Sequence, residues 1–213
     1  MNIIQYFKYS IYLFVLSASL TARADELVTL FRAIHVDNAR TVGQLLERGV
    51  DPNAQDPRGQ VALYVALREG AGKVAALLAA HPALKVDASN AADETPLMMA
   101  ALRGDLASAR LLLERGAMVN RPGWTALHYA ASGPEPKMLV LLLERGAMLE
   151  AESPNRTTAL MMAARYGDEN SALLLLSRGA SASARNERGL SAADFARLAG
   201  RKGLADKLDQ AAK

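Results

Sequence analysis

The most informative absence in this chain is cysteine, which occurs nowhere among its 213 residues. A disulfide framework is therefore excluded, and so is lipid anchoring through a cysteine at a cleaved N-terminus. Histidine is scarce too, and His35, His81 and His128 do not stand at metal-ligand spacing. The sequence has no glycine-rich phosphate loop, no G-x-S-x-G motif and no paired acids on a catalytic face. We therefore expect no catalytic residues, no cofactor and no metal site.

Long hydrophobic runs are lacking as well. The apolar run near the N-terminus, residues 11–20 (IYLFVLSASL), is shorter than the roughly 20 residues that span a bilayer. It follows the positive charge of Lys8 and precedes Ala22 and Ala24, which form the small-x-small pattern of a signal-peptidase site. We therefore expect a cleavable signal peptide, with Asp25 as the first mature residue.

Removal of residues 1–24 would leave residues 25–213 as the mature protein. Because Lys8 and Arg23 are lost and no acid is, the net charge falls from +3 to about +1. A nearly neutral chain argues against nucleic-acid binding. An exported chain without cysteine is more typical of a bacterial periplasm than of extracellular fluid. We therefore expect a periplasmic protein with no membrane anchor after cleavage.

What the chain does have is an internal repeat. The octapeptide LLLERGAM occupies residues 111–118 and again residues 141–148, with shorter copies at residues 45–49 and 175–180. A second pattern lies upstream of these copies, as TPLMMAA from Thr95, TALHYAA from Thr125 and TALMMAA from Thr158. Weaker copies begin at Val28, Val61 and Ser191, and from Val61 onward the starts lie 30 to 34 residues apart. A fixed period of this length indicates a repeat architecture.

This pattern resembles the ankyrin repeat, whose period is near 33 residues. The resemblance implies an all-α solenoid of stacked helix-turn-helix units with β-hairpin-like finger loops. Such a protein is expected to be a monomer on its own and to bind another protein. The units implied in this sequence are residues 25–57, 58–91, 92–121, 122–154, 155–187 and 188–213.

Small and apolar residues recur where such a stack needs them. Each unit has an alanine on its inner helix, which lets neighbouring inner helices approach closely, and the Leu-Leu pairs are expected to fill the space between inner and outer helices. The alanines are Ala33, Ala66, Ala100, Ala130, Ala163 and Ala196. Glycines at the turns are expected to adopt positive φ angles; they are Gly70, Gly104, Gly167 and Gly200 within units, and Gly49, Gly116, Gly146 and Gly179 after the outer helices.

The binding surface implied by the resemblance consists of the fingertips and the exposed edge of the inner helices. Arginine outnumbers glutamate seven to three on this surface, which predicts a partner with an acidic or mixed surface, and Arg, Trp and Tyr are common among binding hot spots. The main predicted contacts are Arg58, Arg68, Glu94, Arg103, Arg121, Trp124, Arg156, Arg165, Tyr166 and Arg188. Gln60, Glu69, Leu102, Ser132, Asn155 and Glu187 accompany them.

The fourth unit departs from the pattern. Nine positions lead from Gly116 to Thr125, against twelve between Gly146 and Thr158, so this finger is short, and it carries Trp124, the only tryptophan. Pro134 and Pro136 replace the usual Gly-Asp turn in the same unit, which predicts a locally reshaped groove. We expect Trp124 to line the centre of that groove with Arg103, Arg165 and Tyr166.

These observations favour a periplasmic protein-binding module that supports or protects an exported enzyme. The alternative is an immunity-type inhibitor of a toxin in the periplasm. A metal chaperone is a weaker alternative, because Met98-Met99 and Met161-Met162 offer thioethers suited to Cu(I), although methionine commonly fills space between packed helices. His128 occupies the family's histidine slot, where the resemblance implies a structural hydrogen bond to the adjoining loop.

Overall fold

The computed structural model describes residues 23–213. This part of the chain forms twelve helices and no strand, so the predicted all-α fold is confirmed. Ala22 and most of the expected signal peptide lie outside the described residues, whereas Ala24 and Asp25 lie in the first turn of a helix over residues 23–35. None of the helices in the described part is both long and apolar enough to cross a bilayer.

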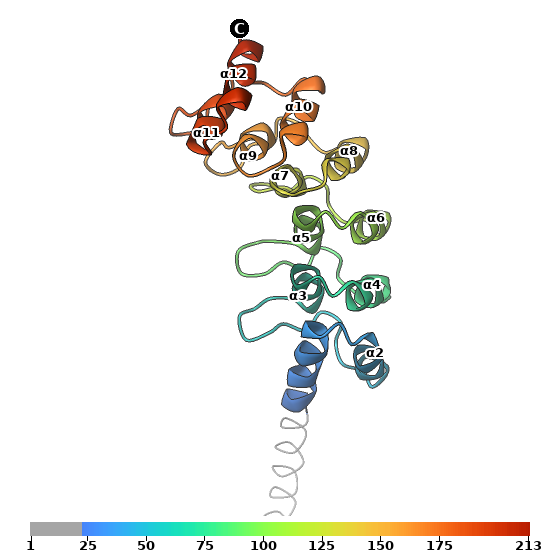
Figure 1. The fold of residues 1–213 in the computed structure, drawn as a ribbon. Coiled ribbons are helices and arrows are strands. Elements are labelled where there is room, and N and C mark those ends of the chain that lie inside the picture. Colours follow the sequence, from blue (N-terminus) through green and yellow to red (C-terminus); the bar gives the residue numbers. More distant parts are fainter. Residues whose placement is uncertain (1–22) are drawn as a thin grey trace, which may run out of the picture.

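The helices stack as two columns, which Figure 1 shows side by side. The inner column contains the helix of residues 23–35, then α3 (Ala62–Glu69), α5 (Pro96–Arg103), α7 (Ala126–Ser132), α9 (Ala159–Arg165) and α11 (Ala192–Leu198). The outer column contains α2 (Ala39–Glu47), α4 (Gly72–Ala80), α6 (Leu106–Glu114), α8 (Pro136–Glu144), α10 (Glu169–Ser177) and the closing helix α12 (Lys202–Ala211). Neighbouring inner helices contact each other more extensively than neighbouring outer helices do.

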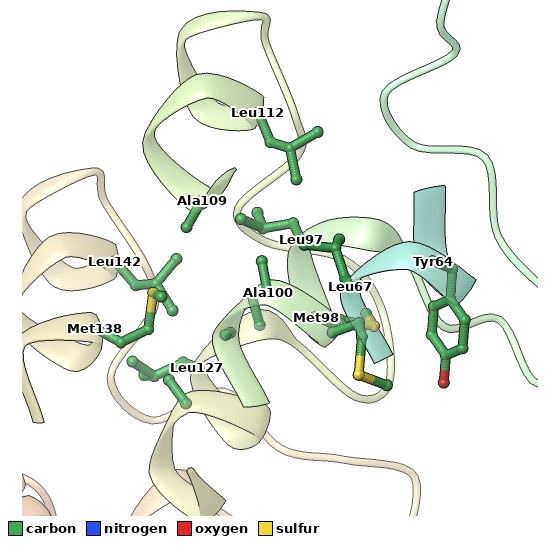
Figure 2. Close-up of a cluster of buried hydrophobic side chains, with 14 of the residues drawn as sticks. Tyr64, Leu67, Leu97, Met98, Ala100, Ala109, Leu112, Leu127, Met138 and Leu142 are labelled. Atoms are coloured by element: carbon green, nitrogen blue, oxygen red, sulfur yellow. The ribbon is translucent and has the colours of Figure 1, made fainter. Parts of the chain in front are cut away.

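Alanine is the reason why the inner helices lie so close together. Ala66, Ala100, Ala130, Ala163 and Ala196 are completely buried, because a methyl group fills the narrow space between adjacent backbones. One leucine of each pair is completely buried and the other packs at the edge of the core. Figure 2 shows this core between α5 and α8, with Leu97 near Leu112 and with Leu127 near Met138 and Leu142. The packing predicted from the repeat is therefore confirmed.

The turn glycines follow the prediction with one exception. Seven of the eight have φ angles between 70° and 91°, as expected at helix ends. The prediction was wrong for Gly167, which does not adopt a positive φ. A Cβ at this position would lie 2.0 Å from the carbonyl oxygen of Ala131. Glycine is needed there because the turn between α9 and α10 presses on the backbone of α7.

The finger loops have the predicted hairpin-like form. Four of them close with the same backbone hydrogen bond, from Asp56 to Gln60 at 3.0 Å, Asn90 to Glu94 at 3.1 Å, Ser153 to Thr157 at 3.0 Å and Asn186 to Leu190 at 3.0 Å. Between Arg121 and Trp124 the described chain makes no such bond, because this finger is three residues shorter than the finger of the next unit. The short finger is therefore an open turn that brings Trp124 directly to the start of α7.

Polar side chains complete the outer column at α4 and at α12. Helix α4 ends at His81 and Pro82, where a glycine is expected, and Arg115 donates hydrogen bonds to the free carbonyls of Ala79 and His81 at 2.6 and 2.7 Å. Helix α12 at the C-terminal end buries Leu204 and Leu208 and exposes its polar side. It forms the end cap that the last unit of a repeat stack needs. The exposed residues include Lys202, Asp206, Lys207, Gln210 and Lys213.

Candidate functional site

A groove of about 390 Å³ lies on the inner-helix face, meaning the exposed sides of the inner helices together with the finger loops. Its volume is at the lower end of the range of about 300 to 1,000 Å³ that is typical of ligand pockets. The groove extends over α5, α7 and α9, and is lined by Leu102, Trp124, His128, Tyr129, Ser132, Met162 and Tyr166. Its walls are therefore mainly apolar and aromatic.

Two aromatic residues of the groove are placed by the ends of helices. Trp124 directly precedes the N-cap of α7, and its ring meets the His128 ring edge-on, with the centroids 5.3 Å apart. Tyr166 forms the C-cap of α9 and is 60% exposed. The guanidinium carbon of Arg165 lies 5.3 Å from the centre of the Tyr166 ring, at cation–π distance. The structure thus brings Trp124 and Tyr166 together in the lining of the groove, as the sequence predicted. Arg165 was predicted to line it too, but it is not among the lining residues.

His128 forms the rigid floor of the groove. Its Nε2 lies 2.9 Å from the carbonyl oxygen of Thr157, and its Nδ1 lies 2.9 Å from Oγ1 of Thr125. A carbonyl can only accept, so Nε2 carries the proton and Nδ1 accepts from the hydroxyl. Burial disfavours the charged ring and lowers the pKa of His128, in spite of the backbone hydrogen bond. The predicted structural bond to the adjoining loop is confirmed.

Glu94 differs from its predicted role as a free binding residue. It is half-buried and accepts hydrogen bonds from the Tyr64 hydroxyl at 2.6 Å, the Tyr129 hydroxyl at 2.7 Å and the Asn90 amide at 2.8 Å. Tyr64 belongs to α3 and Tyr129 to α7, so one carboxylate connects three consecutive units. Figure 2 shows the ring of Tyr64 at the edge of the core, with its hydroxyl directed away from the buried leucines. We refer to these four residues as the Glu94 cluster.

The ionisation of the Glu94 cluster follows from these bonds. Burial opposes the charge on Glu94, but the hydrogen bonds from Tyr64, Asn90 and Tyr129 outweigh it and lower the pKa of Glu94. Burial, followed by the bond to this carboxylate, raises the pKa of both Tyr64 and Tyr129 far above the usual value. The cluster therefore holds one carboxylate and two neutral phenols at neutral pH.

Sequence reasoning missed Tyr64 and Tyr129. The signal that could have found them is a tyrosine where other units have methionine: Tyr64 stands in the slot of Met98 and Met161, and Tyr129 in the next slot, that of Met99 and Met162. A buried tyrosine hydroxyl usually needs a hydrogen-bond partner. Glu94, in the nearby finger loop, is the available acceptor.

Three of the predicted binding arginines pair with carboxylates of the chain itself. Arg121 has a side chain that is only 15% exposed and pairs with Asp93 at 2.7 Å. Arg68 pairs with Glu69 at 2.8 Å, and the exposed Arg156 pairs with Glu152 at 3.2 Å. Arg58, Arg103, Arg165 and Arg188 form no ion pair within residues 23–213.

Two further predictions about the groove need correction. Arg103 does not line the groove; it lies beside Gly70 and Asp105, at the helix turns of its own and the preceding unit. The residues at Pro134 to Pro136 do not line the groove either, because they form the turn between α7 and α8 and press on Gly104. In both cases the residue stands at the C-terminal end of the inner helix, where the chain turns toward the outer column.

The methionine pairs contribute to packing. Met98, Met99 and Met161 are buried, and Met98 Sδ lies 3.4 Å from the backbone nitrogen of Thr95, which donates to it. Met162 contributes to the wall of the groove. The described residues contain no group of three or more His, Cys, Asp or Glu side chains that could hold a metal ion.

Comparison with known proteins places the chain in a family. A family model described as "Ankyrin repeats (3 copies)" matches residues 30–122 and 118–186. The Nuclear factor NF-kappa-B p105 subunit of Gallus gallus is 32% identical over 158 residues, covering 71% of this chain and 16% of that protein. A putative ankyrin repeat protein of Rickettsia bellii is 32% identical over 127 residues, covering 58% of this chain and 49% of that one. The chain thus spans only part of these relatives.

A solved structure is similar over most of the chain. It is the complex of a predatory endopeptidase from Bdellovibrio bacteriovorus with an immunity protein. A chain of this complex aligns with a TM-score of 0.71 and 26% identity, covering 85% of this chain and 97% of that chain. The repeat pattern, the stacked helices and these matches agree. The chain belongs to the ankyrin-repeat family, whose repeats mediate protein–protein interactions.

Proposed function

We propose that this protein is a binding module that holds a protein partner against the groove on its inner-helix face. The observation that carries the proposal is the concentration of aromatic side chains around that groove. Tyr166 is 60% exposed and Trp124 is half-buried, although the core beneath them is already complete. Aromatic residues gathered around an exposed apolar depression are typical of a binding hot spot.

Binding, rather than catalysis, is favoured by the state of the polar groups in the groove. Both ring nitrogens of His128 are engaged, and the Tyr129 hydroxyl is held by Glu94. A general base needs a free lone pair directed at the substrate. None of these groups offers one, and the ankyrin-repeat family is typically non-catalytic.

We infer further that the partner is met in the periplasm. The support is the short apolar run and the Ala22-Arg23-Ala24 pattern in the sequence. Cleavage before Asp25 would keep Leu30 and Ile34, which are completely buried, so the first helix pair would retain its core. N-terminal sequencing of the protein from a periplasmic fraction should begin at Asp25. An intact Met1 in a membrane fraction would contradict this.

The effect of binding has two candidates, inhibition and support of an exported enzyme. The solved complex of an endopeptidase with an immunity protein favours inhibition, because a chain of that complex shares this fold over 97% of its own length. We therefore propose an immunity-type inhibitor of an exported enzyme, with support or protection of such an enzyme as the alternative.

The test begins with capture of the partner from periplasmic extract on immobilised protein. The wild type, Trp124→Ala and a control change on the outer column, Arg110→Ala, are compared; Arg110 is exposed on α6. We expect the same partner with the wild type and Arg110→Ala, and its loss with Trp124→Ala. Assaying the identified partner with and without the wild type then decides between the candidates. Lower activity supports inhibition, whereas a longer lifetime at unchanged activity supports protection.

A further inference from the structure

The floor of the groove offers no free hydrogen-bond donor. The hydroxyl of Ser132 donates to the carbonyl of His128 at 3.1 Å, and the Tyr129 hydroxyl donates to Glu94 at 2.7 Å. His128 itself is saturated by Thr125 and Thr157. A carbonyl or carboxylate inserted here would lose its bonds to water and find no donor to replace them. Together with the mainly apolar and aromatic walls, this favours an apolar group in the groove.

The edge of the groove has a different character, because Arg165 lies there. Its guanidinium is held over the ring of Tyr166, a groove residue, at 5.3 Å. Within residues 23–213 it forms no ion pair, whereas Arg68, Arg121 and Arg156 on the same face are each neutralised by a carboxylate of the chain. A guanidinium fixed in this way can take a carboxylate in a two-bond arrangement.

These two features adjoin each other at the C-terminal end of α9, where Arg165 is followed by the groove residue Tyr166. We propose that the groove receives a loop of the partner that carries a bulky apolar side chain directly beside an aspartate or glutamate. The apolar side chain fills the space lined by Trp124 and Tyr166, and the carboxylate binds Arg165. A loop is favoured over a chain end because the inner-helix face continues past the groove to α3 on one side and to α11 on the other. This inference rests on the proposed function and specifies the chemistry of its partner.

The chain provides its own reporter for the test, since Trp124 is the only tryptophan and lines the groove. Three cyclic peptides of equal length serve as probes, with Asp-Phe-Glu, Asp-Ala-Glu or Lys-Phe-Lys at the centre. Titration is followed by Trp124 fluorescence at low salt. The Asp-Phe-Glu peptide should act at about tenfold lower concentration than the alanine peptide, because burial of the ring supplies most of the affinity. It should act at about fivefold lower concentration than the lysine peptide.

Charge reversal sharpens the test. Arg165→Glu should reverse the order of the two phenylalanine peptides, while Arg110→Glu, the same change on the exposed side of α6, should leave it unaltered. Thermal melts followed by circular dichroism confirm that both variants fold. Equal binding of the two phenylalanine peptides to the wild type, or an unchanged order with Arg165→Glu, would overturn the inference.

Two further outcomes separate the inference from the proposed function. If Trp124→Ala abolishes partner capture but the wild type shows no selectivity among the peptides, the proposed function stands and the inference is wrong. If sedimentation shows a dimer of the wild type that Tyr166→Ala dissociates, a second copy of this chain occupies the groove, and the inference is again wrong.

Discussion

The Glu94 cluster and the groove are neighbours on the inner-helix face, and they differ in how their side chains are satisfied. In the cluster, two tyrosine hydroxyls and one amide converge on a carboxylate, so three units are joined by bonds within the chain. In the groove, Trp124 and Tyr166 lie around a depression of about 390 Å³ that nothing in the described chain fills. The variable positions of a single repeat pattern can therefore serve either to join units or to recognise a partner.

The two regions share one residue. The hydroxyl of Tyr129 belongs to the cluster, while its ring lines the groove. A ring held at its far end by a hydrogen bond to a carboxylate loses little further freedom when a partner binds. The cluster therefore makes one wall of the groove rigid, which favours binding by lowering the entropy that association costs.

The largest expected effect comes from breaking the stack beneath both regions. Ala130 is completely buried in α7, which contributes to the cluster and to the groove. Ala130→Asp places an unpaired charge between helices and should cost about 3 kcal/mol or more of the free energy of unfolding. Ala107→Asp, at an exposed position of α6, is the matched control and should change it little. Urea unfolding followed by circular dichroism measures both. Equal stability of the two variants would show that the inner helices are not packed as described.

The second prediction removes the cluster and leaves the groove in place. Glu94→Ala leaves two partly buried tyrosine hydroxyls without their acceptor and should lower the free energy of unfolding by about 3 kcal/mol. Glu152→Ala also removes a carboxylate, but an exposed one paired with Arg156, and should cost less than about 1 kcal/mol. Urea unfolding of both variants tests this. A cost for Glu94→Ala no larger than that for Glu152→Ala would mean that the cluster does not join the units.

The third prediction alters the groove and leaves the Glu94 cluster in place. Trp124→Ala should weaken partner binding by at least about 2 kcal/mol, or about thirtyfold in Kd, while the melting temperature stays nearly unchanged. Titration calorimetry with the captured partner measures the binding. Lys202→Ala on α12 is the control, since Lys202 is exposed, whereas Lys207 pairs with Glu169 at 2.8 Å. Binding that survives Trp124→Ala but is lost with Lys202→Ala would move the site to the end cap.

The smallest effect is a pH dependence confined to the cluster. Because the pKa of Glu94 is lowered in the folded state, its charged form stabilises the fold. This contribution is complete above the unfolded pKa of about 4.3 and is lost as the pH falls through the lower folded value. The difference in urea midpoint between the wild type and Glu94→Gln should therefore narrow between pH 6 and pH 3. A difference that is constant or widens over this range would contradict the assignment.

The repeat, the all-α fold and much of the packing could be predicted from the sequence alone. Alanine at one slot of every unit, a Leu pair at another and glycine after the outer helices recur often enough to identify the family. The short finger could also be counted from the sequence, and it predicted that Trp124 and Tyr166 would meet. These inferences succeed because each depends on spacing within a unit or between adjacent units, which the period fixes.

Which variable side chains are free depends on contacts between units, and these could not be predicted from the sequence. Glu94 finds its tyrosine partners 30 residues upstream and 35 residues downstream, and Arg121 finds Asp93 28 residues away. No sequence pattern indicates that Arg103 turns toward Gly70, or that Gly167 is needed for a close approach to Ala131 and not for its φ angle. The physical reason is that a period places Cα atoms, whereas contacts between units depend on the direction of each side chain and on which neighbour can neutralise it.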